Sequence, residues 1–159
     1  MFEKKQYTGN RENHYRLLLE QLGALLHGEK NQIANLANAA ALLHQFLSNI
    51  NWVGFYLVSN NELVLGPFQG LPACTRIPFG KGVCGTVAKT HKTLCVDDVT
   101  QYPGHIACDA ASKSELVIPL VKNNNFLGVL DIDSPTLARW DKMDVEHLSK
   151  FCEVLILHI

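Results

Sequence analysis

Apolar residues recur at helical intervals through the first third of the chain. From Glu12 to His27 they are spaced by three and four positions, and Gly28 ends the run. A second run of the same kind extends from Asn31 to about Ser48. The pattern predicts two amphipathic helices joined by a short turn at Gly28.

The middle of the chain follows a different period. Aromatic and branched residues fill segments 52–58 and 63–68, and the polar residues 59–62 between them predict a β-hairpin. A short helix is expected over about 83–90, followed by a brief strand at 93–96.

Two strong strands and a helix complete the pattern. Segments 114–122 and 126–133 are predicted to pair across the asparagines at 123–125. The last helix, over about 140–157, is expected to bury Leu148, Phe151, Leu155 and Cys152. Because the strands are joined by hairpins, we expect an α/β fold of the α+β type, with a central antiparallel sheet and helices packed against it, and not a doubly wound parallel fold.

The second predicted hairpin brings acidic residues together. Asp131 and Asp133 are two positions apart on an otherwise apolar strand, so both point to one face. With a three-residue asparagine loop, Lys122 pairs with Phe126 and Glu115 lies opposite Asp133. The sequence therefore predicts three carboxylates on one face of the sheet.

Both faces of these strands are expected to be covered. Val117, Leu127 and Val129 share the acidic face, whereas Phe126 and Leu130 lie on the other. Clustered carboxylates in a covered environment repel one another and lose solvation, so a positively charged ligand is implied, and an ammonium group fits well. Two alternatives remain open, a strand end that frays into solvent and a divalent cation held by the carboxylate oxygens.

Composition narrows the class of protein. The 159 residues, 47% of them apolar, suffice for one domain with a sizeable core. A net charge of −1 and 18% charged residues disfavour a nucleic-acid or membrane-binding face. The N-terminus lacks the apolar region of a signal peptide, and no apolar run approaches the ~20 residues of a membrane span, so we expect a cytoplasmic protein.

The chain has an odd number of cysteines, which are Cys74, Cys84, Cys95, Cys108 and Cys152. This disfavours a secreted disulfide framework, and the absence of CxxC and CxxH spacing disfavours structural zinc. Cys84 follows Gly80-Lys81-Gly82 near the start of a predicted helix, where the helix dipole and Lys81 are expected to favour the thiolate. Cys95 and Cys152 lie on apolar segments and are expected to be packing residues.

Segment 103–115 is too irregular to be a core helix or strand, and it is rich in residues that can take part in catalysis. It carries His105, Cys108 and two acids. The acids are expected to raise the pKa of Cys108, but in their protonated form they can supply a proton to a leaving oxygen. For His105 two roles remain open, tuning the thiol or fixing the loop through backbone hydrogen bonds.

The chain resembles the free methionine-(R)-sulfoxide reductases, enzymes on the GAF domain fold. The resemblance rests on five motifs, which are Asn51-Trp52-Val53-Gly54-Phe55-Tyr56, the segment 80–86 around Cys84, the segment 103–109 around Cys108, Ser114-Glu115 with Pro119-Leu120, and the segment 128–134 around Asp131 and Asp133. It implies a single GAF domain over 1–159, with a helical extension at 1–30 and the core at 31–159.

The resemblance also implies a reaction, the reduction of free methionine-(R)-sulfoxide to methionine. Cys108 would attack the sulfoxide sulfur and become a sulfenic acid, and a second thiol would then close a disulfide. Cys84 is the first candidate for that thiol because of its helix-terminal position, and Cys74 is the second. Thioredoxin is the implied reductant, and no cofactor or metal is expected.

The implied substrate site consists of Glu115, Asp131 and Asp133, with Trp52 and Tyr56 near the methyl group. The acids would hold the amino group and the sulfoxide oxygen. Ordinary hairpin core remains an equal interpretation of the two aromatic residues. The main rival function is a GAF module that binds a small metabolite without catalysis, and a homodimer through the last helix is left open.

Overall fold

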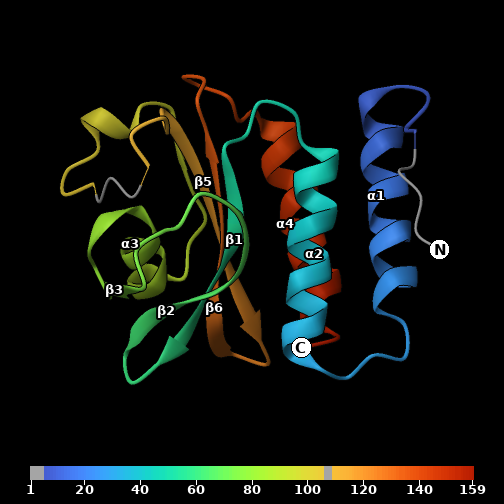
Figure 1. Cartoon of the computed structure of the whole chain (residues 1–159), viewed down its shortest axis with the longest axis horizontal. Helices are drawn as coiled ribbons and strands as arrows, with labels where there is room; N and C mark the ends of the chain where they lie inside the picture. Colours follow the sequence, from blue (N-terminus) through green and yellow to red (C-terminus); the bar gives the residue numbers. More distant parts are fainter. Residues whose placement is uncertain (1–5, 106–108) are drawn as a thin grey trace.

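The computed structural model describes residues 6–105 and 109–159. The order of elements predicted from the sequence is present along this part of the chain (Figure 1). Its α-helices are α1 (Arg11–Leu26), α2 (Gln32–Phe46), α3 (Gly82–Thr90) and α4 (Lys142–Ile156). Its strands are β1 (Trp52–Ser59), β2 (Glu62–Gly70), β3 (Arg76–Pro78), β4 (Leu94–Val96), β5 (Ser114–Lys122) and β6 (Asn125–Ser134).

Polar side chains at the helix starts explain where three of the helices begin. The side chain of Asn10 accepts a hydrogen bond from the backbone of α1, and Asn31 does the same for α2. At α4, Asp141 and Asp144 form a reciprocal capping box. Each cap satisfies a backbone N–H group that has no partner within the helix.

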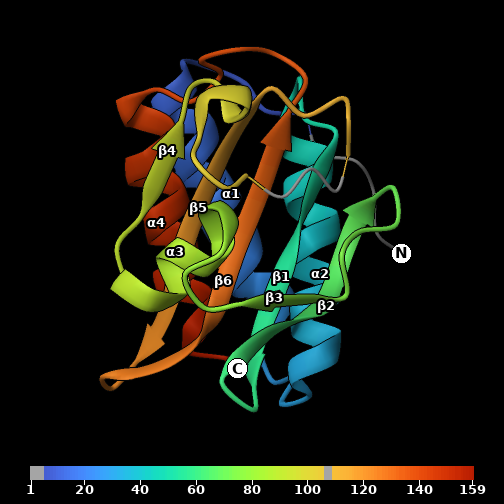
Figure 2. The same cartoon turned by 90° about the vertical axis from the view of Figure 1, so that its left-hand side faces the viewer.

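The strands form one six-stranded sheet in the order β3-β2-β1-β6-β5-β4 (Figure 2). Every neighbouring pair is antiparallel, which confirms the predicted sheet. Strand β3 was not predicted, because three residues that end in Pro78 carry no alternating pattern.

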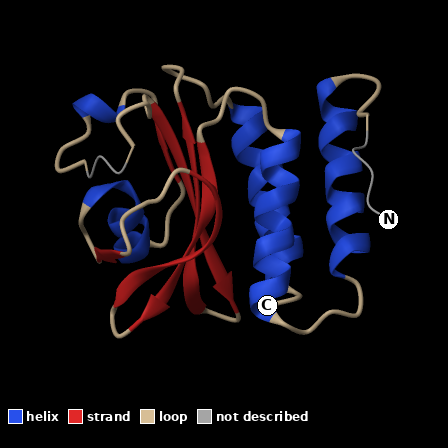
Figure 3. Ribbon diagram, viewed as in Figure 1, coloured by secondary structure: helices blue, strands red, loops and turns tan. Residues whose placement is uncertain are grey.

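The sheet is covered on both faces. Helices α2 and α4 lie against one face with α1 outside them, while α3 and long loops cover the other (Figures 1 and 3). Val53 and Phe55 point toward α2 and α4, and their neighbours Trp52 and Tyr56 point toward α3. No helix among residues 6–105 and 109–159 is both long and apolar enough to cross a membrane.

The turn between β5 and β6 differs from the prediction. Asn123 and Asn124 have φ of 51° and 63° and form a two-residue turn, so Lys122 pairs with Asn125 and not with Phe126. A bulge then leaves Leu127 without an opposite residue, and beyond it Glu115 lies opposite Asp133 as predicted.

The bulge also changes which side chains share a face. Phe126 packs with Val117 and Val129 on the acidic side, and Leu127 packs with the core around α2 and α4. The predicted faces of Phe126 and Leu127 were therefore reversed, because one extra residue inverts the alternation only between the turn and the bulge.

Gly128 makes this bulge possible. Its φ is 152°, and a Cβ atom there would lie 2.1 Å from the carbonyl oxygen of Tyr56 on the neighbouring strand. Gly128→Ala should therefore lower the free energy of unfolding by about 2–4 kcal/mol, measured by urea denaturation.

The matched control is Gly23→Ala, in the middle of α1. A Cβ atom at Gly23 would meet nothing within 4 Å, so the change should raise the free energy of unfolding by roughly 0.5–1 kcal/mol. Equal effects at the two glycines would show that the bulge does not depend on Gly128.

Candidate active site

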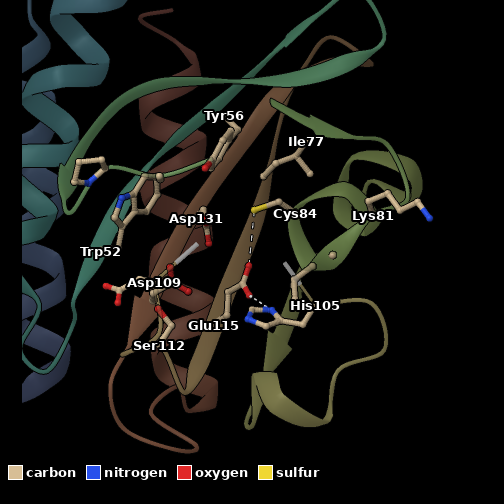
Figure 4. Close-up of a pocket in the computed structure, with 15 residues that line it drawn as sticks. Trp52, Tyr56, Ile77, Lys81, Cys84, His105, Asp109, Ser112, Glu115 and Asp131 are labelled. Carbon is tan, nitrogen blue, oxygen red and sulfur yellow. Dashed lines mark hydrogen bonds and ion pairs between the residues drawn. The ribbon is translucent and has the colours of Figure 1, made fainter. Parts of the chain in front are cut away.

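A pocket opens on the sheet face that is covered by α3 (Figure 4). It contains about 540 Å³ of space not filled by protein atoms, and this figure includes its mouth open to solvent. Fifteen residues from β1, the 71–84 region, the 105–115 region and β6 line it, and they are Trp52, Tyr56, Pro72, Ala73, Ile77, Lys81, Gly82, Val83, Cys84, His105, Asp109, Ser112, Glu115, Asp131 and Asp133.

Three neighbouring strands place the acids in this pocket. Asp133 on β6 lies opposite Glu115 on β5 and opposite Trp52 on β1, so the three form one row across the sheet. Asp131 lies one step along β6, opposite Gly54. Strand β6 continues to Ser134, so the alternative in which it frays into solvent at Asp131 is wrong.

Burial controls the ionisation of these acids. Glu115 and Asp131 are each 6% exposed. Burial and the neighbouring carboxylates raise the pKa of Glu115 and Asp133 well above the usual range, and burial raises the pKa of Asp131 to about 7. At neutral pH the cluster therefore holds protons unless a cation joins it.

The described residues supply no cationic partner for the cluster. No lysine or arginine of residues 6–105 and 109–159 forms an ion pair with any of the three acids. Lys81 is exposed and its side chain points away from Glu115 and Asp131 (Figure 4). Asp131 Oδ1 is buried and has no hydrogen-bond partner within this part of the chain, so the site can accept a donor from a ligand.

Cys84 lies in the first turn of α3 and faces the acids. Its Sγ is 3.8 Å from Glu115 Oε1. The expectation of a favoured thiolate was wrong, because burial, together with Asp131 and Glu115, raises the pKa of Cys84 well above its usual range. Desolvation and negative neighbours thus outweigh the dipole of a nine-residue helix.

The other cysteines differ in environment. Cys74 is disulfide-bonded, whereas Cys84, Cys95 and Cys152 are free. Cys152 is buried in the core as predicted, but Cys95 is exposed, so its predicted packing role was wrong. The expected nucleophile Cys108 lies outside the described residues.

Trp52 and Tyr56 line the pocket and also support the loop that carries Cys74. The Trp52 indole donates a hydrogen bond of 3.1 Å to the carbonyl of Leu71, and the Tyr56 hydroxyl donates one of 3.0 Å to the carbonyl of Cys74. The two rings stack with centroids 5.9 Å apart. Trp52 also stacks on Phe68, with centroids 5.3 Å apart. The polar groups of Trp52 and Tyr56 are thereby used within the chain, so the ring edges that line the pocket are apolar.

His105 approaches the cluster from the opposite side. Its Nδ1 is 3.9 Å from Glu115 Oε2, which is too long for a hydrogen bond. Burial lowers the pKa of His105 and raises that of Glu115, so both groups favour their neutral forms at neutral pH. The contact is therefore not an ion pair when the pocket holds no cation.

Comparison with known proteins agrees with this geometry. The GAF domain model matches residues 31–159. The free methionine-R-sulfoxide reductase of Escherichia coli is 50% identical over 139 residues, which cover 87% of this chain and 84% of that protein. The free methionine-R-sulfoxide reductase of Saccharomyces cerevisiae is 46% identical over 154 residues, with coverage of 92% and 86%.

A solved structure shares the fold closely. The free methionine-R-sulfoxide reductase of Neisseria meningitidis, in complex with its substrate, is 42% identical with a TM-score of 0.93, and the match covers 99% of this chain and 95% of that one. The chain belongs to the free methionine-R-sulfoxide reductase family of GAF domain proteins.

The sequence did not predict that Asn51 supports two residues that line this reductase-family pocket, Asp109 and Ser112. Asn51 Nδ2 donates hydrogen bonds to Asp109 Oδ2 at 2.8 Å and to Ser112 Oγ at 2.9 Å. These contacts fix the residues that follow segment 106–108 against the start of β1. An asparagine one position before a strand carries no signal for contacts with residues 58 and 61 positions away.

The raised pKa of Asp131 predicts a pH-dependent stability for this reductase-family chain. The folded pKa of about 7 exceeds the ordinary 3.8, so the folded protein binds more protons than the unfolded chain between these values. The contribution of Asp131 to the free energy of unfolding is therefore complete below pH 3.8 and is lost as the pH rises through about 7.

Urea unfolding with chelator present, at several pH values from mildly acidic to mildly alkaline, tests this. Relative to the parent, Asp131→Asn should gain in free energy of unfolding as the pH rises, by at most about 1.4 kcal/mol per pH unit. Glu12→Gln, at an exposed position, should follow the parent. Parallel profiles for Asp131→Asn and the parent would contradict the ionisation assigned to Asp131.

Proposed function

We propose that this chain reduces free methionine-(R)-sulfoxide to methionine. The proposal is carried by one observation, the pocket that holds the buried Glu115 and Asp131 and the half-buried Asp133 without a described cation. Trp52 lines the same pocket. Relatives that are 46–50% identical bear the name of this activity, which supports the same chemistry here. A zwitterionic amino acid supplies the missing positive charge.

The acids would select the free amino acid. An ammonium group offers three donors and a positive charge to the cluster, including the unpartnered Oδ1 of Asp131. A peptide nitrogen is a neutral amide with one hydrogen, so it would leave buried carboxylate oxygens without partners. Glu115 and Asp133, which favour the protonated form, would donate to the sulfoxide oxygen.

Cys108 is the proposed nucleophile. Its sulfur attacks the sulfoxide sulfur, the sulfoxide oxygen takes a proton from a neighbouring carboxylic acid, and oxygen passes from the substrate to Cys108. The balance is one thiol and one sulfoxide converted to one sulfenic acid and one sulfide. The thiol proton returns to the carboxylate, so the acid is regenerated.

A second thiol then closes a disulfide and releases water, and thioredoxin reduces that disulfide by exchange. We assign this step to Cys74 ahead of Cys84. Cys74 is already disulfide-bonded, whereas Cys84 is a buried free thiol whose raised pKa disfavours the attacking thiolate. The hydrogen bond from Tyr56 to the Cys74 carbonyl would hold the resolving loop in place.

A thioredoxin-coupled assay with the separated sulfoxide epimers tests the activity. The R epimer of the free amino acid should be reduced, and N-acetylated substrate should react at least about 100-fold more slowly because its nitrogen cannot be an ammonium. Cys108→Ser should lower the rate by about 1,000-fold or more.

One control variant and two contradicting outcomes make the assay decisive. Cys95→Ser, at the exposed free thiol, should keep the parent's rate. Equal rates on blocked and free substrate would remove the role of the acids, and full activity in Cys108→Ser would overturn the enzyme assignment. In that case binding of the sulfoxide without loss of free thiols would identify a metabolite-binding GAF module.

The assignment of the resolving thiol has its own test. After one turnover without reductant, Cys84→Ser should still form an intramolecular disulfide, while Cys74→Ser should stop at a sulfenic acid that a dimedone-type reagent traps. Peptide mapping by mass spectrometry identifies the bonded pair. If only Cys84→Ser failed to form the disulfide, the order of the two thiols would be reversed.

A further inference from the structure

The proposed reaction leaves Cys84 without a chemical step, although Cys84 is a free thiol that lies against the acids. Sγ of Cys84 and one carboxylate oxygen each of Glu115 and Asp131 lie within 4.8 Å of one another. All three side chains are more than nine-tenths buried. They come from α3, β5 and β6, so rigid elements hold them together.

We propose that Cys84, Glu115 and Asp131 form a binding site for a thiophilic divalent cation, zinc in particular, which competes with the substrate for the pocket. The cation would be an inhibitor and not a resident cofactor, because it takes the place that the proposed function gives to the substrate ammonium group. The competition thus rests on the proposed function, whereas the metal site does not.

The spacing of the ligand atoms suits zinc. With bond lengths of about 2.3 Å to sulfur and 2.1 Å to oxygen, tetrahedral coordination places a sulfur and an oxygen ligand roughly 3.6 Å apart. The distance from Cys84 Sγ to Glu115 Oε1 is 3.8 Å. A small shift of side chains would therefore close the site, and the pocket leaves the fourth position open to water.

A second observation points to a ligand at the same place. Asp131 Oδ1 is buried and lacks a hydrogen-bond partner among the described residues. A buried oxygen without a partner is costly, and a bound cation satisfies it directly. Thiolate in the donor set favours zinc over magnesium and calcium, which take oxygen ligands only.

Cobalt(II) provides the probe, because a cobalt–thiolate bond gives a charge-transfer band in the near ultraviolet. The full chain would be prepared with the Cys74 disulfide intact, so that Cys84, Cys95 and Cys152 are the free described thiols. One equivalent of cobalt(II) should produce the band, and zinc should abolish it. Cys84→Ser should lack the band, and Cys95→Ser should retain it.

Two isosteric variants test the acids without relying on the cysteine change alone. Glu115→Gln and Asp131→Asn should each weaken cobalt binding by about 10-fold or more, with circular dichroism used to verify folding. No band in the parent at millimolar cobalt(II), or an undiminished band in Cys84→Ser, would overturn the site.

Substrate competition separates the metal site from the proposed function. Free methionine sulfoxide should displace cobalt, and zinc should inhibit reduction competitively in the coupled assay. Inhibition that excess sulfoxide does not relieve would overturn the competition. A chain that binds cobalt through Cys84 but shows no reductase activity would refute the proposed function and leave the metal site standing.

Discussion

The crowding of three carboxyl groups, two of them buried, on one covered face of a β-sheet is the constraint on which the site depends. Glu115, Asp131 and Asp133 come together only because β5 and β6 pair in one register, and α3 then closes over them. Removed from water, the acids are stable as protonated groups or beside a cation. Holding these acids together thus costs free energy, and a positively charged ligand lowers that cost. A pocket without a described lysine or arginine partner is therefore suited to the ammonium group of an amino acid.

Much of this arrangement could be predicted from the sequence, although part of it for an incomplete reason. The period of two and the hairpin placed Glu115 opposite Asp133, yet the assumed three-residue loop does not exist. A two-residue turn and a bulge near Gly128 add up to the same offset, so only Phe126 and Leu127 were assigned to the wrong faces. The alternation of apolar and polar residues predicts the register of long strands well, because many positions must agree with it. It predicts one-residue irregularities such as bulges poorly.

The ionisation of Cys84 and the exposure of Cys95 could not be predicted from their neighbours in the sequence. The position of Cys84 at a helix start favours a thiolate, but its pKa depends on the complete enclosure of the sulfur and on acids from two other strands. Those contacts join residues about 30 to 50 positions apart, so no sequence window contains them. The exposure of Cys95 has a related cause, because β4 is a three-residue strand at the edge of the sheet and has a neighbouring strand on one side only.

Strand β1 and the residue before it join one wall of the pocket to two other segments of the chain. Trp52 and Tyr56 form a wall of the pocket, and the same two side chains hold the loop of Cys74 by hydrogen bonds to its carbonyls. Asn51, one residue earlier, holds the residues that follow the segment of Cys108. Because the polar groups of these aromatic residues are already used, they can offer a ligand only apolar surface. In the function proposed above, the acids would therefore have to distinguish free from peptide-bound substrate. Strand β1 and the residue before it therefore anchor both the segment that carries Cys74 and the residues that follow segment 106–108.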